Sequence, residues 1–232
     1  MFNLTNTAKI VVPALALLAT AVSFSSHASV TPDRTRLVFN ESDKSISVTL
    51  RNNDPTLPYL AQSWIEDAKG NKISSPLAVL PPVQRIDAMM NGQVKVQGLP
   101  DINKLPADRE SVFYFNVREI PPKSNKPNTL QIALQTRIKL FWRPANIRLI
   151  PEDAAPKVKW RREGRNLIAE NPNPIHISVM DVIVDGHDVP LNMIRPFETL
   201  TLPLPANSAG SQMIRRFIND YGAVSEPIKM PL

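Results

Sequence analysis

The stretch LQIALQTRIKLFWRP, residues 130–144, alternates apolar and polar side chains along almost its whole length. Its even positions carry apolar side chains: Leu130, Ile132, Leu134, Ile138, Leu140 and Trp142. Its odd positions are mostly glutamine, arginine or lysine, and a period of two is typical of a β-strand with two unlike faces. We therefore predict one strand over residues 130–144, roughly 45 to 50 Å long at ~3.3 Å per residue. The usual strand has about 5 to 6 residues, so this length indicates a role beyond closing a sheet.

The composition favours an all-β protein. The 232 residues include 23 Pro, 7 Gly and no Cys. Average usage of ~5% would give about half that number of prolines. Most of the prolines separate short apolar runs, as in β-proteins whose loops and edge strands tolerate a residue without an N–H group. At about 100 to 200 residues per domain, the length suits one large domain or two small ones.

The apolar runs form two blocks. The first block, with runs at residues 37–39, 46–50, 59–65, 94–96, 112–117 and 130–144, is interpreted as a seven-stranded sandwich, although only six runs stand out. The second has runs at residues 158–160, 166–170, 175–184, 199–202, 212–218 and 226–230, with Asp185-Gly186 as its strongest hairpin signal. Polar and proline residues at 151–156 separate the blocks. We predict two β-sandwich domains, at residues 29–147 and 152–232.

The N-terminus has the pattern of an export signal. Lys9 precedes an apolar core at residues 10–22, and Ser26-His27-Ala28 places small residues where a signal peptidase reads them. We predict a signal peptide over residues 1–28, with cleavage after Ala28. The alternative is an uncleaved anchor, but the apolar core is short for a membrane span. An exported protein without Cys has no disulfides, so its β cores alone must stabilise it.

Residues for catalysis or metal binding are scarce. After residue 28 the chain has only two histidines, His176 and His187, and it has no Cys, Gly-rich phosphate loop or H-E-x-x-H motif. We expect His176 to pack within a strand and His187 to lie in a turn. The net charge is +6, but the basic residues are mixed with acidic ones and lack interleaved aromatic side chains. The sequence therefore predicts no enzyme, cofactor, metal site or nucleic-acid partner.

Several segments resemble the periplasmic pilus (fimbrial) chaperone family, most closely its P-pilus type. They are the long strand together with DRTR at 33–36, LPYLAQSWI at 57–65, PPVQR at 81–85, DRESVFYFN at 108–116 and REIPP at 118–122. The likeness continues more weakly through ENPNP at 170–174 and INDYG at 218–222. The short segment at residues 122–128 is similar to that of the subfamily serving rod-type pili. The resemblance implies two immunoglobulin-like β-sandwich domains in an L shape, which bind pilus subunits in the periplasm and deliver them to an outer-membrane usher.

The resemblance also implies three sets of site residues. The anchor for the terminal carboxylate of a pilus subunit would be Arg36 and Lys139. The apolar side chains inserted into the subunit groove would be Leu130, Ile132 and Leu134. A buried network between the domains would consist of Glu110, Arg143 and Asp220.

Alternatives to these roles stay open at the level of sequence. The three apolar side chains would, without the resemblance, be expected to line the chain's own core. Lys139 has the alternative role of preventing edge pairing. Simple alternation also puts Lys139 on the face opposite to Ile132, so twist or a bulge would have to reconcile their roles. The binding role of residues 152–232 and self-association without subunit are undecided.

An exported carbohydrate-binding or adhesin β-sandwich is the alternative function. That class is expected to offer a cluster of exposed aromatic side chains or a metal site. The chain has only 3 Trp and 3 Tyr. The pilus chaperone is therefore the favoured interpretation.

Overall fold

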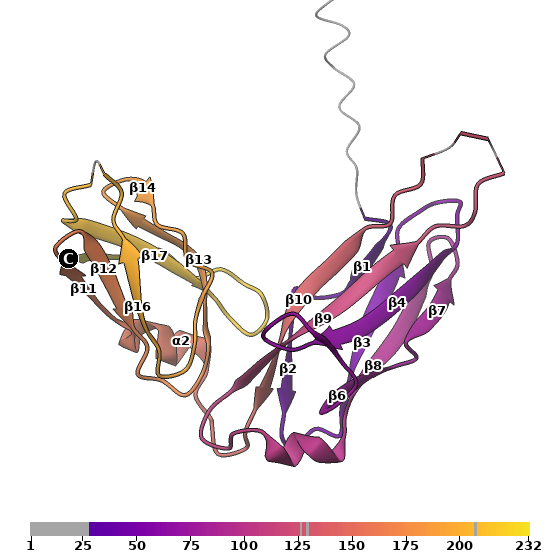
Figure 1. The fold of residues 1–232 in the computed structure, drawn as a ribbon, viewed down its shortest axis with the longest axis horizontal. Helices are drawn as coiled ribbons and strands as arrows, with labels where there is room; N and C mark the ends of the chain where they lie inside the picture. The colour runs from indigo at the N-terminus through magenta and orange to yellow at the C-terminus, as the bar shows by residue number, and fades with distance from the viewer. Residues whose placement is uncertain (1–27, 126, 129, 207) are drawn as a thin grey trace, which may run out of the picture.

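The computed structural model describes residues 28–125, 127–128, 130–206 and 208–232. The predicted signal peptide, apart from Ala28, lies outside the described residues. The chain forms two β-sandwich domains that meet at an angle, like the two arms of an L (Figure 1). The predicted all-β, two-sandwich architecture is confirmed.

The first domain packs a sheet of four strands against a sheet of six. The smaller sheet has the order β1-β3-β8-β6: Val30–Pro32, Ser45–Asn52, Asn91–Gly98 and Leu77–Leu80. The larger has the order β2-β10-β9-β4-β5, with β7 also on β4: Arg36–Asn40, Gln135–Arg143, Ser111–Ile120, Tyr59–Glu66, Lys72–Ile73 and Val83–Ile86. A short 3-10 helix, η1, covers Pro100–Lys104. The inner faces bury one apolar core, whose largest fully buried side chains include Phe39 and Phe115.

The second domain has its own core and two smaller sheets. One has the order β11-β12-β16: Lys159–Glu163, Asn166–Glu170 and Thr199–Pro203. The other has the order β14-β13-β17-β18, with β15 also on β13: His187–Asp188, Ile177–Val184, Gln212–Ile218, Ile228–Pro231 and Met193–Ile194. The predicted β13–β14 hairpin is confirmed, and its turn residues Asp185 and Gly186 have φ of 48° and 83°, the left-handed values that a type I′ turn requires.

A short helical segment opens the second domain, and its Ala154 and Ala155 are buried in that domain's core. The polar stretch predicted as a boundary forms α2, Pro151–Ala154, followed by the 3-10 turn η2, Ala155–Lys157. Proline suits the first turn of α2, because the N–H group it lacks has no intrahelical partner there.

Strand β10 separates two environments. Its even-numbered side chains Ile138, Leu140 and Trp142 belong to the core of the first domain. Of its odd-numbered side chains, Phe141 lies against the ring of His176 in the second domain, with 5.3 Å between ring centroids. The alternation that predicts this strand thus separates a core face from a face directed at the other domain.

The prediction of a continuous strand over residues 130–144 is wrong for its first five residues. β10 begins at Gln135, which pairs with Arg118 of β9. Continuing that register would set Ile132 opposite Pro121 and Gln131 opposite Pro122. Proline has no N–H group to donate, so the ladder cannot continue.

The apolar side chains before β10 are therefore left outside the sandwich. Leu130 is 85% exposed and Ile132 is 63% exposed. Leu134 is half-buried, and its carbonyl accepts a 3.0 Å hydrogen bond from Glu119 N–H. The apolar residues at even positions thus continue in the sequence beyond those that fill the core, but their side chains lie outside it.

Candidate functional site

Parallel pairing of β2 and β10 brings two cations together. Lys139 is the register partner of Arg36, although about a hundred residues separate them in sequence. Both reach the second domain: Arg36 Nη1 donates to the carbonyl of Ile218 at 3.2 Å, and Lys139 Nζ donates to the carbonyl of Asn192 at 3.1 Å. The Arg36 and Lys139 side chains therefore lie side by side where the domains meet.

This cation pair is electrostatically unfavourable on its own. Burial, together with the nearby charge of Arg36, lowers the pKa of Lys139 to about 8. Burial also lowers the pKa of Arg36, although Asp220 opposes the change. The Arg36 Nε–H group is buried and has no hydrogen-bond partner. Two desolvated cations with an unused donor form a site that an anionic group would stabilise.

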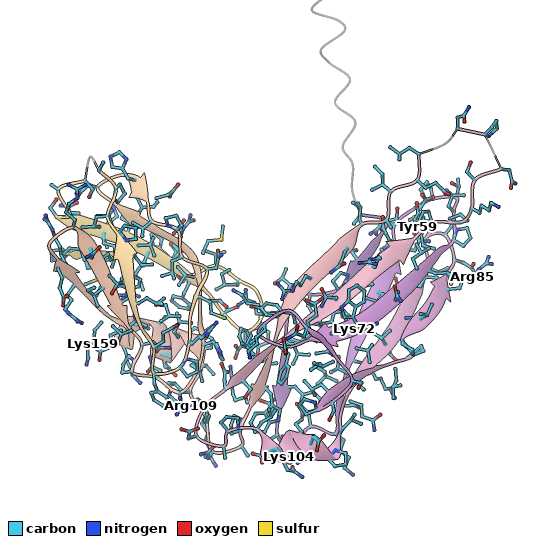
Figure 2. The ribbon with its side chains drawn as sticks, viewed as in Figure 1. Tyr59, Lys72, Arg85, Lys104, Arg109 and Lys159 are labelled. Carbon is cyan, nitrogen blue, oxygen red and sulfur yellow. The ribbon has the colours of Figure 1, made fainter. Side chains whose placement is uncertain are left out.

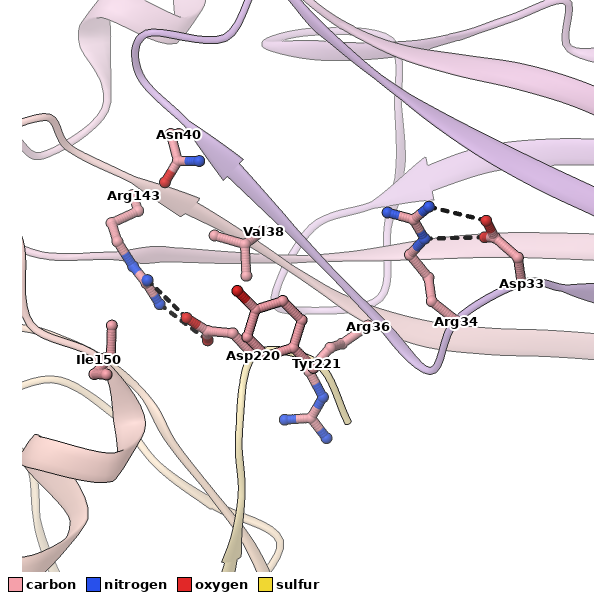
Figure 3. A pocket seen from close by; sticks show the side chains of 9 residues that line it. All are labelled: Asp33, Arg34, Arg36, Val38, Asn40, Arg143, Ile150, Asp220 and Tyr221. Atoms are coloured by element: carbon pink, nitrogen blue, oxygen red, sulfur yellow. Dashed lines mark hydrogen bonds and ion pairs between the residues drawn. The ribbon is translucent and has the colours of Figure 1, made fainter. Parts of the chain in front are cut away.

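A cavity of about 550 Å³ opens beside Arg36 between the domains (Figure 3). Its lining combines cationic, anionic and apolar side chains: Asp33, Arg34, Arg36, Val38, Asn40, Arg143, Ile150, Asp220 and Tyr221. Tyr221, on the turn between β17 and β18, is largely exposed. A polypeptide end has room to lie in this cavity.

Arg143 joins the two domains by ion pairs. Its Nε lies 2.7 Å from Oε1 of Glu110, just before β9, and its Nη1 lies 2.8 Å from Oδ2 of Asp220 in the second domain. Arg143 is 7% exposed and Glu110 3% exposed. Burial opposes the charge of Arg143, but its hydrogen bonds and charge pairing with Asp220 and Glu110 outweigh burial and raise its pKa. The structure thus places the three residues of the predicted network in direct contact.

His176 belongs to the same network, which the sequence does not predict. Its backbone N–H donates to Glu110 Oε2 at 2.8 Å, and its Nδ1 lies 3.2 Å from that oxygen. Sequence reasoning assigns His176 only a packing role. The available signal is its place two residues after the ENPNP segment, whose Pro174 carbonyl accepts a 2.8 Å hydrogen bond from Glu110 N–H.

Two further contacts hold the domains together. The Arg109 guanidinium lies 4.9 Å from the ring centroid of Phe197, a residue with a left-handed φ of 58°, and Figure 2 shows Arg109 where the domains meet. Gly222 has a φ of 90°, and a Cβ there would lie 2.3 Å from Thr35 Oγ1. Glycine is therefore required at this close approach between the β17–β18 turn and the first domain.

The exposed apolar segment borders a second hollow. A cavity of about 620 Å³ lies between residues 130–132 and the segment that follows β9, with Leu57, Pro121, Leu130 and Ile132 in its lining. Neither Leu130 nor Ile132 is part of the first domain's core cluster. The alternative in which these two residues line the chain's own core is wrong.

The alternative role of Lys139 as an edge protector does not fit its position. At Lys139, β10 is paired with β2 on one side and β9 on the other, so no sheet edge is present there. The expected conflict of faces also disappears, because residues 130–134 are not part of the strand. Strand alternation therefore does not relate Lys139 to Ile132.

In residues 28–125, 127–128, 130–206 and 208–232, no group of three or more His, Cys, Asp or Glu side chains is placed to hold a metal ion. In the part of the chain that the structure describes, no helix combines the length and hydropathy needed to cross a membrane.

Sequence comparisons identify the same family across both domains. Residues 29–148 match the model for the pili and flagellar-assembly chaperone PapD N-terminal domain, and residues 153–229 match that for the pili assembly chaperone PapD C-terminal domain. The chain is 59% identical to the probable fimbrial chaperone YfcS of Escherichia coli K12, over 100% of this chain and 92% of that protein. It is 42% identical to the chaperone protein PapD of Escherichia coli, over 84% of this chain and 83% of that protein.

Solved structures show the same architecture. The SafB chaperone, solved in complex with the SafA pilin of Salmonella enterica, superposes with a TM-score of 0.78 at 27% identity, covering 90% of this chain and 99% of that one. The Escherichia coli chaperone DraB superposes with a TM-score of 0.77 at 30% identity, covering 88% and 99%. With both sandwiches matched and close relatives along its whole length, the chain belongs to the PapD-like family of pilus assembly chaperones.

Proposed function

We propose that this protein binds pilus subunits in the periplasm, stabilises them by lending them a strand, and delivers them to an outer-membrane usher. One observation carries the proposal: Leu130 and Ile132, two large apolar side chains in the segment just before β10, are exposed outside the sandwich. Strand addition of this kind is the established way in which pilus chaperones bind pilins. The relatives named above carry the chaperone role in their names, and SafB was solved with a pilin.

The exposed segment supplies what an incomplete subunit lacks. A pilin missing its last strand has an open sheet edge and an uncovered core. Leu130, Ile132 and Leu134 would enter that core while their backbone pairs with the open edge. Each side chain contributes roughly 1.5 to 3 kcal/mol when fully buried, so three give on the order of 5 to 9 kcal/mol before the costs of ordering.

The cation pair formed by Arg36 and Lys139 would fix how the subunit's last residues align with the protein. A carboxylate at the end of the subunit would accept hydrogen bonds from Arg36 and Lys139, two neighbouring cations whose charge is opposed by burial. Arginine offers a planar fork and lysine a compact charge. Fixing the chain end there would set which pilin residues meet the exposed apolar row.

The proposal is tested by co-expressing the protein with a pilin and purifying the periplasmic fraction. We expect a soluble one-to-one complex and degradation or aggregation of the pilin when the chaperone is omitted. Pilin that accumulates equally well without the protein would contradict the function, and sugar binding without pilin binding would favour the adhesin alternative.

Replacing Ile132 with aspartate should abolish pilin capture without unfolding the protein. An exposed side chain tolerates a charge, whereas burying that charge in the pilin core is strongly unfavourable. Met180→Asp is a matched control, because Met180 is also an exposed apolar side chain but lies on the second domain. Co-purification with pilin and circular dichroism separate the two effects; a globally unfolded Ile132→Asp variant would contradict this role.

Capture should weaken as pH rises from 7 to 9. The pKa of Lys139 is about 8, so only about a tenth of the free protein carries the Lys139 proton at pH 9. A bound carboxylate favours the protonated ammonium, and binding therefore takes up a proton. Binding of a pilin C-terminal peptide, measured by calorimetry at constant ionic strength, checks this; Lys139→Arg should remove the pH dependence.

The same pKa predicts the opposite trend for the free protein's stability. Between about pH 8 and the ordinary lysine value of 10.5, the unfolded chain binds the proton more tightly than the folded one. The contribution of Lys139 to the free energy of unfolding therefore rises with pH across this window. General alkaline unfolding would lower stability and capture together. Deprotonation of Lys139 should lower capture while raising its contribution to stability, so measuring both distinguishes the two causes.

The proposed export signal predicts where the mature protein begins. If residues 1–28 form a cleaved signal, the mature protein begins at Ser29. N-terminal sequencing of the protein from a periplasmic extract checks this, and finding residues 1–28 retained would support the uncleaved anchor instead.

A further inference from the structure

The second domain contains a small hollow formed by residues that are distinct from Arg36, Lys139 and residues 130–134. Its volume is about 10 Å³, and its walls come from Val158, just before β11, and from residues of β11, β13 and β17: Trp160, Ile177, Val179, Arg215, Arg216 and Phe217. About 10 to 15 Å³ is enough for one guest the size of a water molecule. The hollow is therefore the right size for a single small ion or molecule.

Two unused N–H donors lie among the polar groups of this wall. Arg215 Nε and Trp160 Nε1 are both buried and have no hydrogen-bond partner. The Arg215 guanidinium carbon lies 5.8 Å from the centre of the Trp160 ring, so the two side chains are neighbours. Leaving a buried donor unpaired is costly, and more so for a charged group, so an acceptor placed in the hollow would stabilise both side chains.

The charge of Arg215 is also uncompensated. Arg215 is 8% exposed, and its Nη1 donates to the carbonyl of Ala155 at 3.0 Å. Among the residues that the structure describes, no carboxylate forms an ion pair with it; the neighbouring Arg216 is paired with Asp181. Arginine does not lose its proton in proteins, so the buried positive charge persists.

We propose that this hollow binds one halide-sized anion, chloride in ordinary salt solution, held by Arg215 Nε–H and Trp160 Nε1–H. A water molecule would accept the two hydrogen bonds but leave the buried charge uncompensated, whereas a monovalent anion meets both needs. The apolar walls formed by Val158, Ile177 and Val179 favour a weakly hydrated anion over a strongly hydrated one. The anion would fasten β11 to β17, and through Ala155 to the η2 turn.

Chloride should stabilise the protein in a saturable way. The test measures urea unfolding of the full mature chain while sodium gluconate is replaced by sodium chloride at constant ionic strength. Binding to the folded state alone lowers the unfolding equilibrium constant by about a hundredfold when chloride is at 100 times its dissociation constant. Bromide should act similarly, and an unfolding constant independent of the anion would overturn the proposal.

Variants assign the effect to this hollow. Trp160→Phe keeps the ring but removes the Nε1–H donor, and Arg215→Gln removes the charge, so both should weaken or abolish the chloride effect. Arg161→Gln is the matched control, because Arg161 is exposed on the same strand and paired with Glu163; it should keep the full effect. A chloride effect unchanged in Trp160→Phe and Arg215→Gln would place the anion elsewhere and overturn the assignment.

A crystal of the unaltered protein soaked in sodium bromide provides a test that needs no variant. An anomalous peak between Arg215 Nε and Trp160 Nε1 supports the proposal. Density there without an anomalous signal means that water alone fills the hollow, and it overturns the proposal. Pilin capture plays no part in these measurements, so their outcome is independent of the proposed chaperone function.

Discussion

Alanine at Arg36 or at Lys139 is expected to reduce pilin capture by about ten- to a hundredfold while leaving the fold intact. A hydrogen bond to a charged partner contributes ~1.5 to 3 kcal/mol, and each 1.4 kcal/mol is a factor of ten in affinity. The fold should survive because burial already opposes the charge of both side chains, as their lowered pKa values indicate. Binding of a pilin C-terminal peptide and thermal unfolding measure the two effects separately.

Two controls make this result specific. Arg85→Ala removes an arginine that is exposed on β7 and paired with Asp87, so capture should not change. Amidating the peptide's C-terminus removes the carboxylate from the other side and should weaken binding to the unaltered protein by a similar factor. Normal capture by both the Arg36 and Lys139 variants would refute the anchor.

Arg143→Ala is expected to have the largest effect on stability. It leaves the buried carboxylate of Glu110 without its 2.7 Å partner and frees Asp220 of the second domain. Removing one partner of a buried ion pair typically costs ~3 to 5 kcal/mol, which corresponds to a fall in Tm of roughly 6 to 20 °C for a chain of this size. Arg85→Ala, which breaks an exposed pair, should cost about 0 to 1 kcal/mol.

The same variant should loosen the angle between the domains. An interface between two domains of one chain is mobile unless specific contacts fix it. Small-angle scattering should show a broader distribution of shapes, and combining Arg143→Ala with Asp220→Ala should cost less than the sum of the single changes. Additive effects with an unchanged scattering profile would show that the ion pairs do not hold the domains.

Periodicity is enough to predict the architecture but not where strands end. The alternation from Ile138 to Trp142 predicts that one face of the strand lies in the core, and in the structure these side chains are buried there. The same alternation continues through Ile132, yet the strand stops because the partner strand β9 ends at Ile120 and is followed by Pro121 and Pro122. A strand's limits depend on its neighbour, and no pattern within one segment contains that information.

For the candidate site, too, the sequence predicts some features and misses others. Resemblance, and not spacing, groups Glu110, Arg143 and Asp220, whose contact depends on how two domains are placed. No periodicity or spacing marks His176 as a partner of Glu110, or Phe197 as a partner of Arg109, because each pair joins different domains. Contacts across an interface are set by tertiary geometry, which local patterns do not encode.

The parallel pairing of β2 with β10 has a consequence for timing. A chain that emerges N-terminus first presents β2 early, but the partner strand β10 is the last of the first domain to appear. Until then Arg36 has no neighbouring Lys139, and the edge of β2 stays open. Pairing β2 with β10 closes a loop of about a hundred residues, and contacts so distant in sequence form late in folding. In the proposed function, the anchor formed by Arg36 and Lys139 therefore exists only once the first domain is complete, so a partly synthesised copy could not yet hold a subunit.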